Sequence, residues 1–178
     1  MNTERKQSSK ERGNRMGLKD IIKKISSGDS GESSSCLNAC VKGKAIPLSE
    51  VKDEVFSSGA LGKGCGFIPE TGEVYAPADG RVEMVFPTKH AIGLKTKGGA
   101  EVLIHIGINT VELNGKGFDY FVKQGDKVSK GQLLEKFDLK GIKDQGYDTT
   151  VIVVVTNSDE YRRIELEEDA LVLEKQEG

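Results

Sequence analysis

At the centre of the sequence stands the run Glu101-Val102-Leu103-Ile104-His105-Ile106-Gly107-Ile108. Successive side chains of an extended chain point to opposite faces, so this run predicts a strand with two unlike faces. One face is apolar throughout, and we expect it to lie against the core; it carries Val102, Ile104, Ile106 and Ile108. The other face carries Leu103, His105, Gly107 and Asn109. The pattern therefore predicts a core strand that presents an imidazole on its outer face.

Eight further short apolar runs flank this one, and glycine or other turn residues separate them. The runs comprise residues 44–48, 64–69, 73–77, 80–86, 92–96, 119–122, 132–137 and 149–156. Many short strands with turns between them are typical of a β-sandwich or barrel. We therefore predict an all-β, antiparallel sandwich or barrel-like single domain, with at most a turn or two of helix over residues 158–164. A loose similarity between Gly43-Lys44-Ala45 and Gly80-Arg81-Val82 suggests an internally duplicated β-unit.

A polar N-terminal region precedes the predicted domain. Residues 1–15 carry mixed charge and no large apolar side chain after Met1, which predicts disorder. Leu18, Ile21, Ile22 and Ile25 form one helical stripe, and lysines surround it. This predicts a short amphipathic helix around residues 17–25 that makes weak contact with a membrane surface; the alternative is a tail that is helical only transiently. We expect a flexible tail over residues 1–36 and the domain over residues 37–178.

Composition and charge exclude several classes of function. The longest uninterrupted apolar run is Val151–Val155, far short of a membrane span, and the N-terminus has no apolar signal core. The odd number of cysteines, three, leaves at least one thiol unpaired, and because there is no export signal we expect a cytoplasmic protein. The net charge of −2 divides into +5 for residues 1–27 (eight basic, three acidic) and −7 for residues 28–178 (eighteen basic, twenty-five acidic). An acidic domain argues against nucleic acid as a partner.

His90 and His105 are the only histidines, so any imidazole chemistry must use them. If residues 80–86, 92–96 and 102–108 form consecutive antiparallel strands, His90 can lie beside His105. Such a pair could bind zinc with a carboxylate, act as acid and base, or use one ring nitrogen as a nucleophile toward phosphorus. The alternative for each is a half-buried imidazole that bonds a backbone carbonyl. Gly107 leaves out a side chain beside His105, which suits close approach to that ring.

The segment from Gly99 to Leu113, with GAEVLIHIGINTVEL, resembles the phosphohistidine signature of the glucose-type enzyme IIA of the bacterial sugar phosphotransferase system. Thr88-Lys89-His90-Ala91 is similar to that family's second histidine motif, and the resemblance spans about residues 41–172. It implies a β-sandwich in which both histidines lie in a shallow depression. It further implies that His105 accepts a phosphoryl group from the phosphocarrier HPr and passes it to a cysteine of a IIB domain. His90 would then bond the phosphoryl oxygens, Thr88 would support the pair, and neither metal nor organic cofactor is needed.

The resemblance also suggests a partner surface. By position, five apolar residues would ring the histidines, although core packing is the alternative for each: Phe56, Leu61, Phe86, Ile92 and Val111. Asp53 would add negative charge at the rim, while Asn109 stands where the family often has aspartate. Arg163 replaces the carboxylate with which some members recruit zinc and a regulated target. The leading hypothesis is thus a phosphotransferase component; the alternatives are a regulatory module that reports its phosphorylation state to protein targets, and a zinc hydrolase using His90 and His105.

Overall fold

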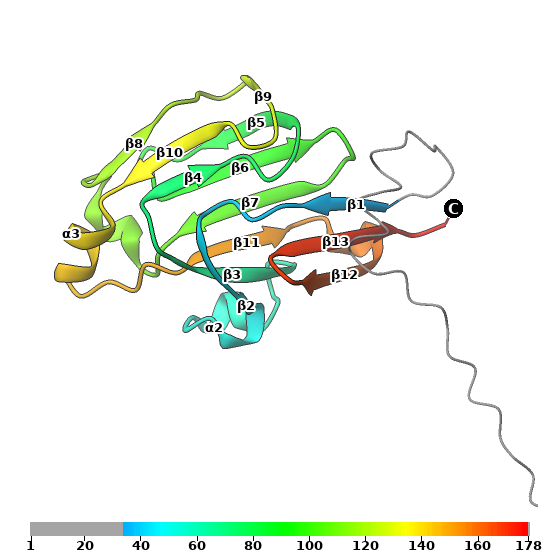
Figure 1. Cartoon of the computed structure of the whole chain (residues 1–178), viewed down its shortest axis with the longest axis horizontal. Helices are drawn as coiled ribbons and strands as arrows, with labels where there is room; N and C mark the ends of the chain where they lie inside the picture. Colours follow the sequence, from blue (N-terminus) through cyan, green and yellow to red (C-terminus); the bar gives the residue numbers. More distant parts are fainter. Residues whose placement is uncertain (1–33, 178) are drawn as a thin grey trace, which may run out of the picture.

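Antiparallel strands are the main regular structure of the computed structural model, which describes residues 34–177 (Figure 1). The largest sheet has seven strands in the order β2-β3-β11-β7-β6-β5-β9. Their bounds are Gly43–Pro47 for β2, Lys63–Pro69 for β3, Gly80–Val85 for β5, Ala91–Thr96 for β6, Glu101–Ile106 for β7, Lys127–Val128 for β9 and Val151–Val155 for β11. The predicted central strand, β7, indeed lies in the middle of this sheet, between β6 and β11.

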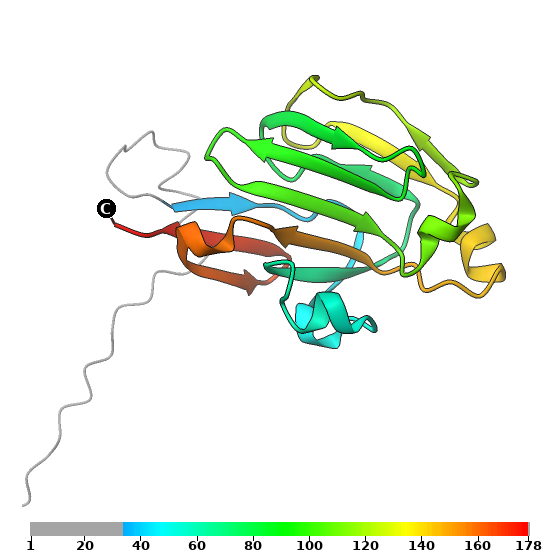
Figure 2. The ribbon, with the colours of Figure 1, turned by 180° about the vertical axis from the view of Figure 1, so that it is seen from behind.

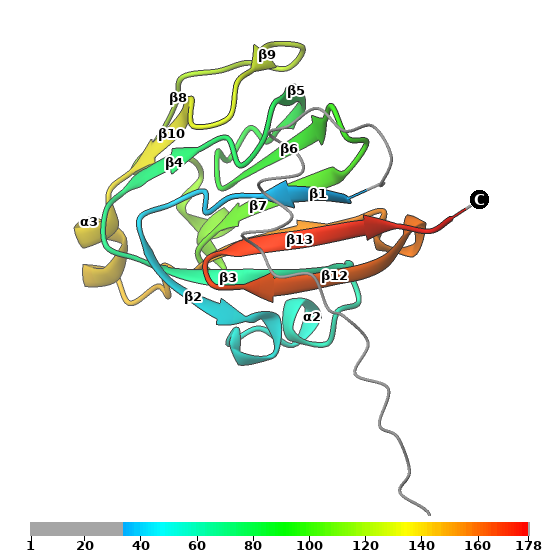
Figure 3. The ribbon, with the colours of Figure 1, turned by 45° about the vertical axis from the view of Figure 1, so that its right-hand side comes forward.

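Two three-stranded sheets and a few short helices complete the fold (Figure 3). One sheet has the order β4-β10-β8, with β4 at Glu73–Tyr75, β8 at Phe118–Tyr120 and β10 at Leu133–Phe137. The other has the order β1-β13-β12, with β1 at Ser34–Leu37, β12 at Tyr161–Glu167 and β13 at Ala170–Lys175. The α-helices are α2 at Glu54–Ser57 and α3 at Leu139–Asp144. Three 3-10 turns are η1 at Leu48–Glu50, η2 at Thr110–Leu113 and η3 at Ser158–Glu160.

The main core lies on the apolar face of β7. Val102, Ile104 and Ile106 are almost completely buried there. Ile104 stands in register between Ile92 of β6 and Val153 of β11, and all three side chains belong to the same buried cluster, which also includes residues of the two smaller sheets. The all-β, antiparallel sandwich predicted from the sequence is therefore confirmed, and its core is where the alternation of β7 placed it.

A second, smaller apolar cluster covers the opposite face of the large sheet. It contains Ile46, Val51, Phe56, Ile108, Ile152 and Val154. Asp53 begins α2 by accepting a hydrogen bond from the Phe56 backbone N–H with its side chain, and this helix lies below β2 and β3 in Figure 2. Because β11 has this cluster on one side and the main core on the other, all five of its residues are buried. The cluster gives the histidine face of the sheet its own apolar support.

Ile108 corrects the predicted strand. We expected it on the core face with Ile106, but β7 ends at Ile106 and Gly107 has a positive φ of 75°. That turn breaks the two-residue alternation, so Ile108 packs in the second cluster on the histidine side. The site thus stands at the end of a strand, where the chain leaves the sheet.

All nine predicted strand runs contain strands, but four strands were missed: β1, β9, β12 and β13. The expected helix over 158–164 is only η3, followed by β12, whose polar residues hide its strand character. The predicted tail boundary at residue 36 falls inside β1, which pairs with β13 from the far end of the chain. The predicted helix around 17–25 lies outside the described residues. The suggested duplication of a β-unit stays a prediction. Its two proposed copies are connected differently, since η1 and α2 lie between β2 and β3 whereas no helix lies between β5 and β6.

Cys36, Cys40 and Cys65 are all free thiols. Cys40 and Cys65 are completely buried, and burial raises the pKa of both; that of Cys65 reaches about 12. Burial also raises the pKa of the partly exposed Cys36. Among residues 34–177, no helix has the length and apolar character needed to cross a membrane.

Candidate active site

The two histidines lie side by side because of the pairing between β6 and β7. Ala91, the first residue of β6, stands opposite His105, and the backbone carbonyl of His90 accepts a hydrogen bond from Ile106 N–H at 2.7 Å. The centroids of the two imidazole rings are 4.9 Å apart, and the rings are nearly perpendicular, at 80°. The strand order β5-β6-β7 that we expected from the sequence is confirmed, and so is the proximity of the rings that it implied.

Gly107 determines which nitrogen of His105 is free. His105 Nδ1 lies 2.8 Å from the carbonyl oxygen of Gly107. A carbonyl can only accept, so Nδ1 carries the proton and donates, and Nε2 keeps its lone pair. That Gly107 opens space beside the ring stays a prediction, and the structure shows a second reason for glycine here. An added Cβ would lie 2.5 Å from Thr110 Cγ2 and 2.8 Å from the Asp148 carbonyl oxygen, at a positive φ that favours glycine.

The loop that carries His90 is held from two sides. Thr88 Oγ1 lies 2.7 Å from His90 Nδ1, the contact that the resemblance implied. The Tyr120 hydroxyl donates to the Ala91 carbonyl at 2.6 Å and accepts from Phe86 N–H at 3.3 Å, so it clamps both ends of the loop. Sequence reasoning missed Tyr120, because it comes from β8 and no local pattern links it to the histidines.

Both imidazoles are neutral at neutral pH. Burial is the largest cause of the low pKa of His105, about 4, and neighbouring His90 lowers it further. The Gly107 carbonyl and the charge of Asp53 act in the opposite direction. Burial also lowers the pKa of His90. A neutral imidazole with a free Nε2 lone pair can act as a nucleophile without first losing a proton.

The predicted partner surface is assembled only in part. The Phe56 ring lies 4.9 Å from that of His105, and the Phe86 ring lies 5.5 Å from that of His90. Leu61 and Val111 are exposed, at 41% and 46%. Ile92 was wrongly included: it is 1% exposed, because it stands opposite Ile104 and points with it into the main core.

Asp53 and Asn109, the polar residues predicted at the rim, lie in different parts of the site. Asp53 lies close enough to His105 for its charge to influence that ring, and its carboxylate also caps α2. Asn109 is exposed at the start of η2 with a left-handed φ of 60°, and it lines a groove of about 320 Å³ together with Lys52 and Glu112. Ile108 also lines this groove, which therefore begins directly after Gly107.

A zinc site would need further ligands. Within residues 34–177, no group of three or more His, Cys, Asp or Glu side chains is arranged to hold a metal ion. Arg163, which we expected at the position of a zinc-recruiting carboxylate, forms ion pairs with Glu174 at 3.0 Å and with Glu165 at 3.0 Å. The described residues thus offer the two imidazoles alone.

Comparisons with known proteins bear on the family and the fold of the chain. The model of the family described as phosphoenolpyruvate-dependent sugar phosphotransferase system (PTS), EIIA 1, matches residues 35–161. The chain is 55% identical over 119 residues to the PTS glucose-specific EIICBA component of Staphylococcus carnosus, covering 67% of this chain and 18% of that relative. It is 51% identical over 125 residues to the PTS beta-glucoside-specific EIIBCA component of Bacillus subtilis, covering 70% of this chain and 20% of that relative.

Among solved structures, glucose permease IIA from Mycoplasma capricolum superposes with a TM-score of 0.68 at 34% sequence identity. The match covers 79% of this chain and 94% of that one. The chain therefore spans about a fifth of the curated relatives named above, and its fold corresponds to nearly all of the solved IIA chain.

Proposed function

This chain belongs to the EIIA 1 family of the phosphoenolpyruvate-dependent sugar phosphotransferase system, as a glucose-type phosphotransferase component, and on that premise we propose that His105 carries the phosphoryl group. The observation that supports this choice is the hydrogen bond from His105 Nδ1 to the Gly107 carbonyl. It leaves a single ring nitrogen, Nε2, with a lone pair. By contrast, the Nδ1 atom of His90 faces the Thr88 hydroxyl rather than a backbone carbonyl.

In the proposed step, the lone pair of His105 Nε2 attacks the phosphorus atom of the phosphorylated donor. A nitrogen–phosphorus bond forms on His105 while the donor's bond to phosphorus breaks, and its electron pair returns to the donor. The proton on Nδ1 stays in place and keeps its bond to the Gly107 carbonyl. Transfer to the acceptor is the reverse displacement, with a cysteine thiolate as the nucleophile. Positioning and charge stabilisation provide most of the catalysis in such transfers.

His90 is the proposed stabiliser of the transferred charge. If the Thr88 hydroxyl donates to His90 Nδ1, the proton of the neutral ring sits on Nε2, where it can be donated to a phosphoryl oxygen. The perpendicular arrangement of the two rings keeps the edge of one beside the other. A donor that is already in place costs no reorganisation when charge develops.

We propose HPr as the phosphoryl donor and the IIB domain of a glucose-type permease as the acceptor. Relatives named EIICBA and EIIBCA join all three components in one chain, which supports a IIB partner. The exposed apolar side chains of Leu61 and Val111 suit brief docking by either partner. The three free thiols agree with a reducing, cytoplasmic location.

The test is phosphotransfer from radiolabelled phosphoenolpyruvate through enzyme I and HPr, followed by IIB. We expect acid-labile, base-stable label on the native chain and none on His105→Ala. His90→Ala should accept label but pass it on at least about tenfold more slowly, because it lacks the stabilising donor. Normal labelling of His105→Ala would overturn the assignment. Zinc bound stoichiometrically to the purified protein would instead favour the hydrolase hypothesis.

A further inference from the structure

We propose that Asp148 is a positioning residue for His105: its carboxylate holds the turn whose carbonyls fix Gly107, and thereby keeps the nucleophilic lone pair on His105 Nε2. This inference rests on the proposed function for its catalytic consequence. Its structural content stands on a continuous series of hydrogen bonds from Asp148 to the imidazole.

The series begins with the Asp148 side chain. Asp148 Oδ1 accepts from the Thr150 backbone N–H at 2.8 Å and from the Thr150 hydroxyl at 2.6 Å. Two bonds to one oxygen close the segment from 148 to 150 into an Asx turn, the local structure that aspartate side chains favour. The Asp148 side chain is only partly exposed, and Thr149 and Thr150 are buried.

The turn presents two carbonyl groups to the segment that follows β7. Gly107 N–H donates to the Thr150 carbonyl at 2.9 Å, and Ile108 N–H donates to the Asp148 carbonyl at 2.9 Å. The Gly107 carbonyl in turn accepts from His105 Nδ1 at 2.8 Å. The imidazole proton is thus three hydrogen bonds away from the Asp148 carboxylate.

Regular sheet pairing does not provide this support. The register between β7 and β11 ends at Ile106 opposite Val151, one residue before Gly107. Beyond that point, the turn from 148 to 150 contributes both of the backbone hydrogen bonds that Gly107 and Ile108 N–H make. Thr110 closes the other side, since its buried hydroxyl donates to the Ile106 carbonyl. If the turn loosens, the carbonyl that selects the tautomer of His105 is free to rotate.

If the tautomer of His105 were no longer fixed, we expect phosphoryl transfer to slow even though the protein stays folded. A neutral imidazole carries its proton on one nitrogen or the other, according to the acceptors around it. When Nδ1 has no fixed acceptor, part of the population carries the proton on Nε2, which then has no lone pair for phosphorus. We therefore expect slower phosphoryl acceptance with unchanged docking of the donor.

The experiment combines ¹⁵N NMR of the imidazole with the rate of phosphorylation by phospho-HPr. Asp148→Ala should show a mixture of the two His105 tautomers and a maximal rate lowered about tenfold or more, with an unchanged KM for phospho-HPr. Asp148→Asn keeps an oxygen acceptor and should restore both the tautomer and the rate to within about twofold of wild type.

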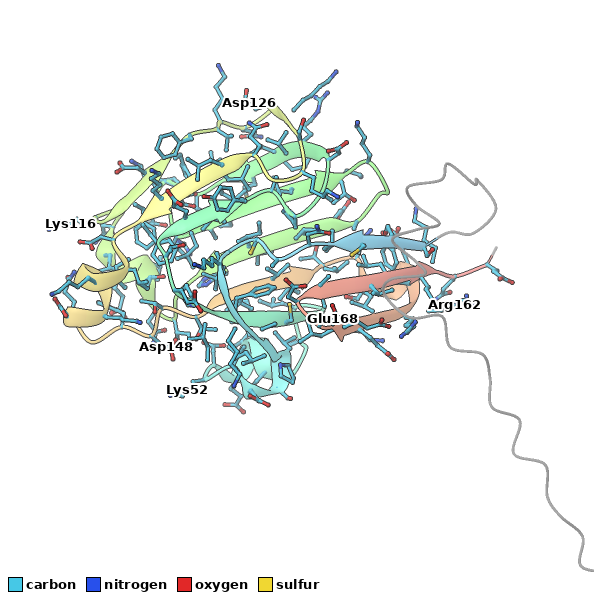
Figure 4. The ribbon with its side chains drawn as sticks, in the orientation of Figure 1. Lys52, Lys116, Asp126, Asp148, Arg162 and Glu168 are labelled. Carbon is cyan, nitrogen blue, oxygen red and sulfur yellow. The ribbon has the colours of Figure 1, made fainter. Side chains whose placement is uncertain are left out.

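Asp126→Ala is the matched control. The Asp126 carboxylate likewise accepts a nearby backbone N–H, from Lys123 at 3.0 Å, but Asp126 lies at the top edge of the molecule in Figure 4, whereas Asp148 lies at the lower left. It should change neither the tautomer nor the rate. Thr150→Val is a second variant, which removes only the hydrogen bond from the Thr150 hydroxyl to Asp148. We expect a smaller change in tautomer and rate, and this variant decides the proposal if Asp148→Ala does not fold.

A wild-type tautomer in Asp148→Ala, or in Thr150→Val when that variant is the one that folds, would overturn the proposal. The NMR measurement uses no phosphoryl donor, so it is independent of the proposed function. If the native chain fails to take label while Asp148→Ala still shifts the tautomer, the proposed function fails and the positioning role holds.

Discussion

His105 is neutral over an unusually wide range of pH, because burial and its neighbour His90 disfavour the charged ring. Its pKa of about 4 lies below the ordinary 6.5, so the unfolded chain takes up a proton there before the folded one does. That difference leaves the fold's stability unaffected by this group above about pH 6.5 and lowers it progressively as the pH falls toward 4. It also keeps the nucleophile active in mildly acidic conditions.

We predict that NMR titration will show His105 still neutral at pH 5.5. An ordinary, exposed histidine would be mostly protonated at that pH. The rate of phosphoryl acceptance, measured with pre-formed phospho-HPr to bypass enzyme I, should correspondingly change little between pH 6 and 8. A midpoint near 6.5 for the His105 resonances would contradict this prediction.

Gly107→Ala should be far more harmful than a glycine substitution elsewhere. Gly107 and Gly125 both have positive φ, 75° and 92°, but a Cβ at Gly125 meets no atom within 4 Å, whereas at Gly107 it collides with Thr110 and the Asp148 carbonyl. Gly125→Ala should cost about 1 kcal/mol from backbone strain alone. Gly107→Ala should cost about 3 kcal/mol and abolish labelling of His105. Urea unfolding of the pair measures the difference, and equal costs would contradict the steric argument.

At this scale, the sequence was sufficient for the histidines but not for their supports. His90 and His105 could be paired because consecutive strands bring them together: His105 lies within an apolar run and His90 directly before one. Tyr120 and Asp148 touch the same site from segments about 30 to 43 residues away in the chain. Their local sequence does not predict their contact with the histidine segments, because that contact depends on how the sheets pack.

Among the elements, η2 should matter most for partner docking. Its Val111 side chain is exposed just beyond the turn that positions His105. Val111→Asp should raise the KM for phospho-HPr about tenfold with little change in maximal rate, because it places a charge in an apolar contact. Phe121→Asp is the control, since Phe121 is more exposed but follows β8 of the smaller sheet. An equal effect of both variants would count against this surface.

Strand prediction succeeded where apolar runs lie between turn residues, and failed where charge interrupts them. β12 contains Arg162, Arg163, Glu165 and Glu167, a composition that looks helical or irregular. In the folded chain, Arg163 pairs with Glu174 of the neighbouring strand β13, so the charges join the strands. β1 begins in a serine-rich segment and is a strand only because β13 returns beside it.

At the scale of the whole molecule, the buried carboxyl group of Glu135 opposes stability at neutral pH. Glu135 of β10 is completely buried, and within residues 34–177 neither of its carboxyl oxygens has a hydrogen-bond partner. Burial raises its pKa to about 9, and Asp119 adds to this, while Lys89 acts in the opposite direction. Between about pH 4.5 and 9 the unfolded carboxyl is ionised and the folded one is protonated. Folding then takes up a proton, so stability falls as the pH rises through this window.

Glu135→Leu should therefore stabilise the protein at pH 8 by about 2 kcal/mol and flatten the dependence of stability on pH above 4.5. Chemical unfolding at a series of pH values would measure both effects. Glu83→Gln, at an exposed position of β5, serves as the control and should leave the slope unchanged. An unaltered slope in Glu135→Leu would show that another group governs it.

The interior thiols have a consequence for the fidelity of the relay. In our proposal the phosphoryl group passes from an imidazole to a cysteine sulfur, yet the carrier has three cysteine thiols of its own. Cys40 and Cys65 are sealed in the interior, and the raised pKa of all three thiols keeps them protonated. None of them therefore competes effectively for the phosphoryl group, which stays on the imidazole until a thiolate of the acceptor binds beside it.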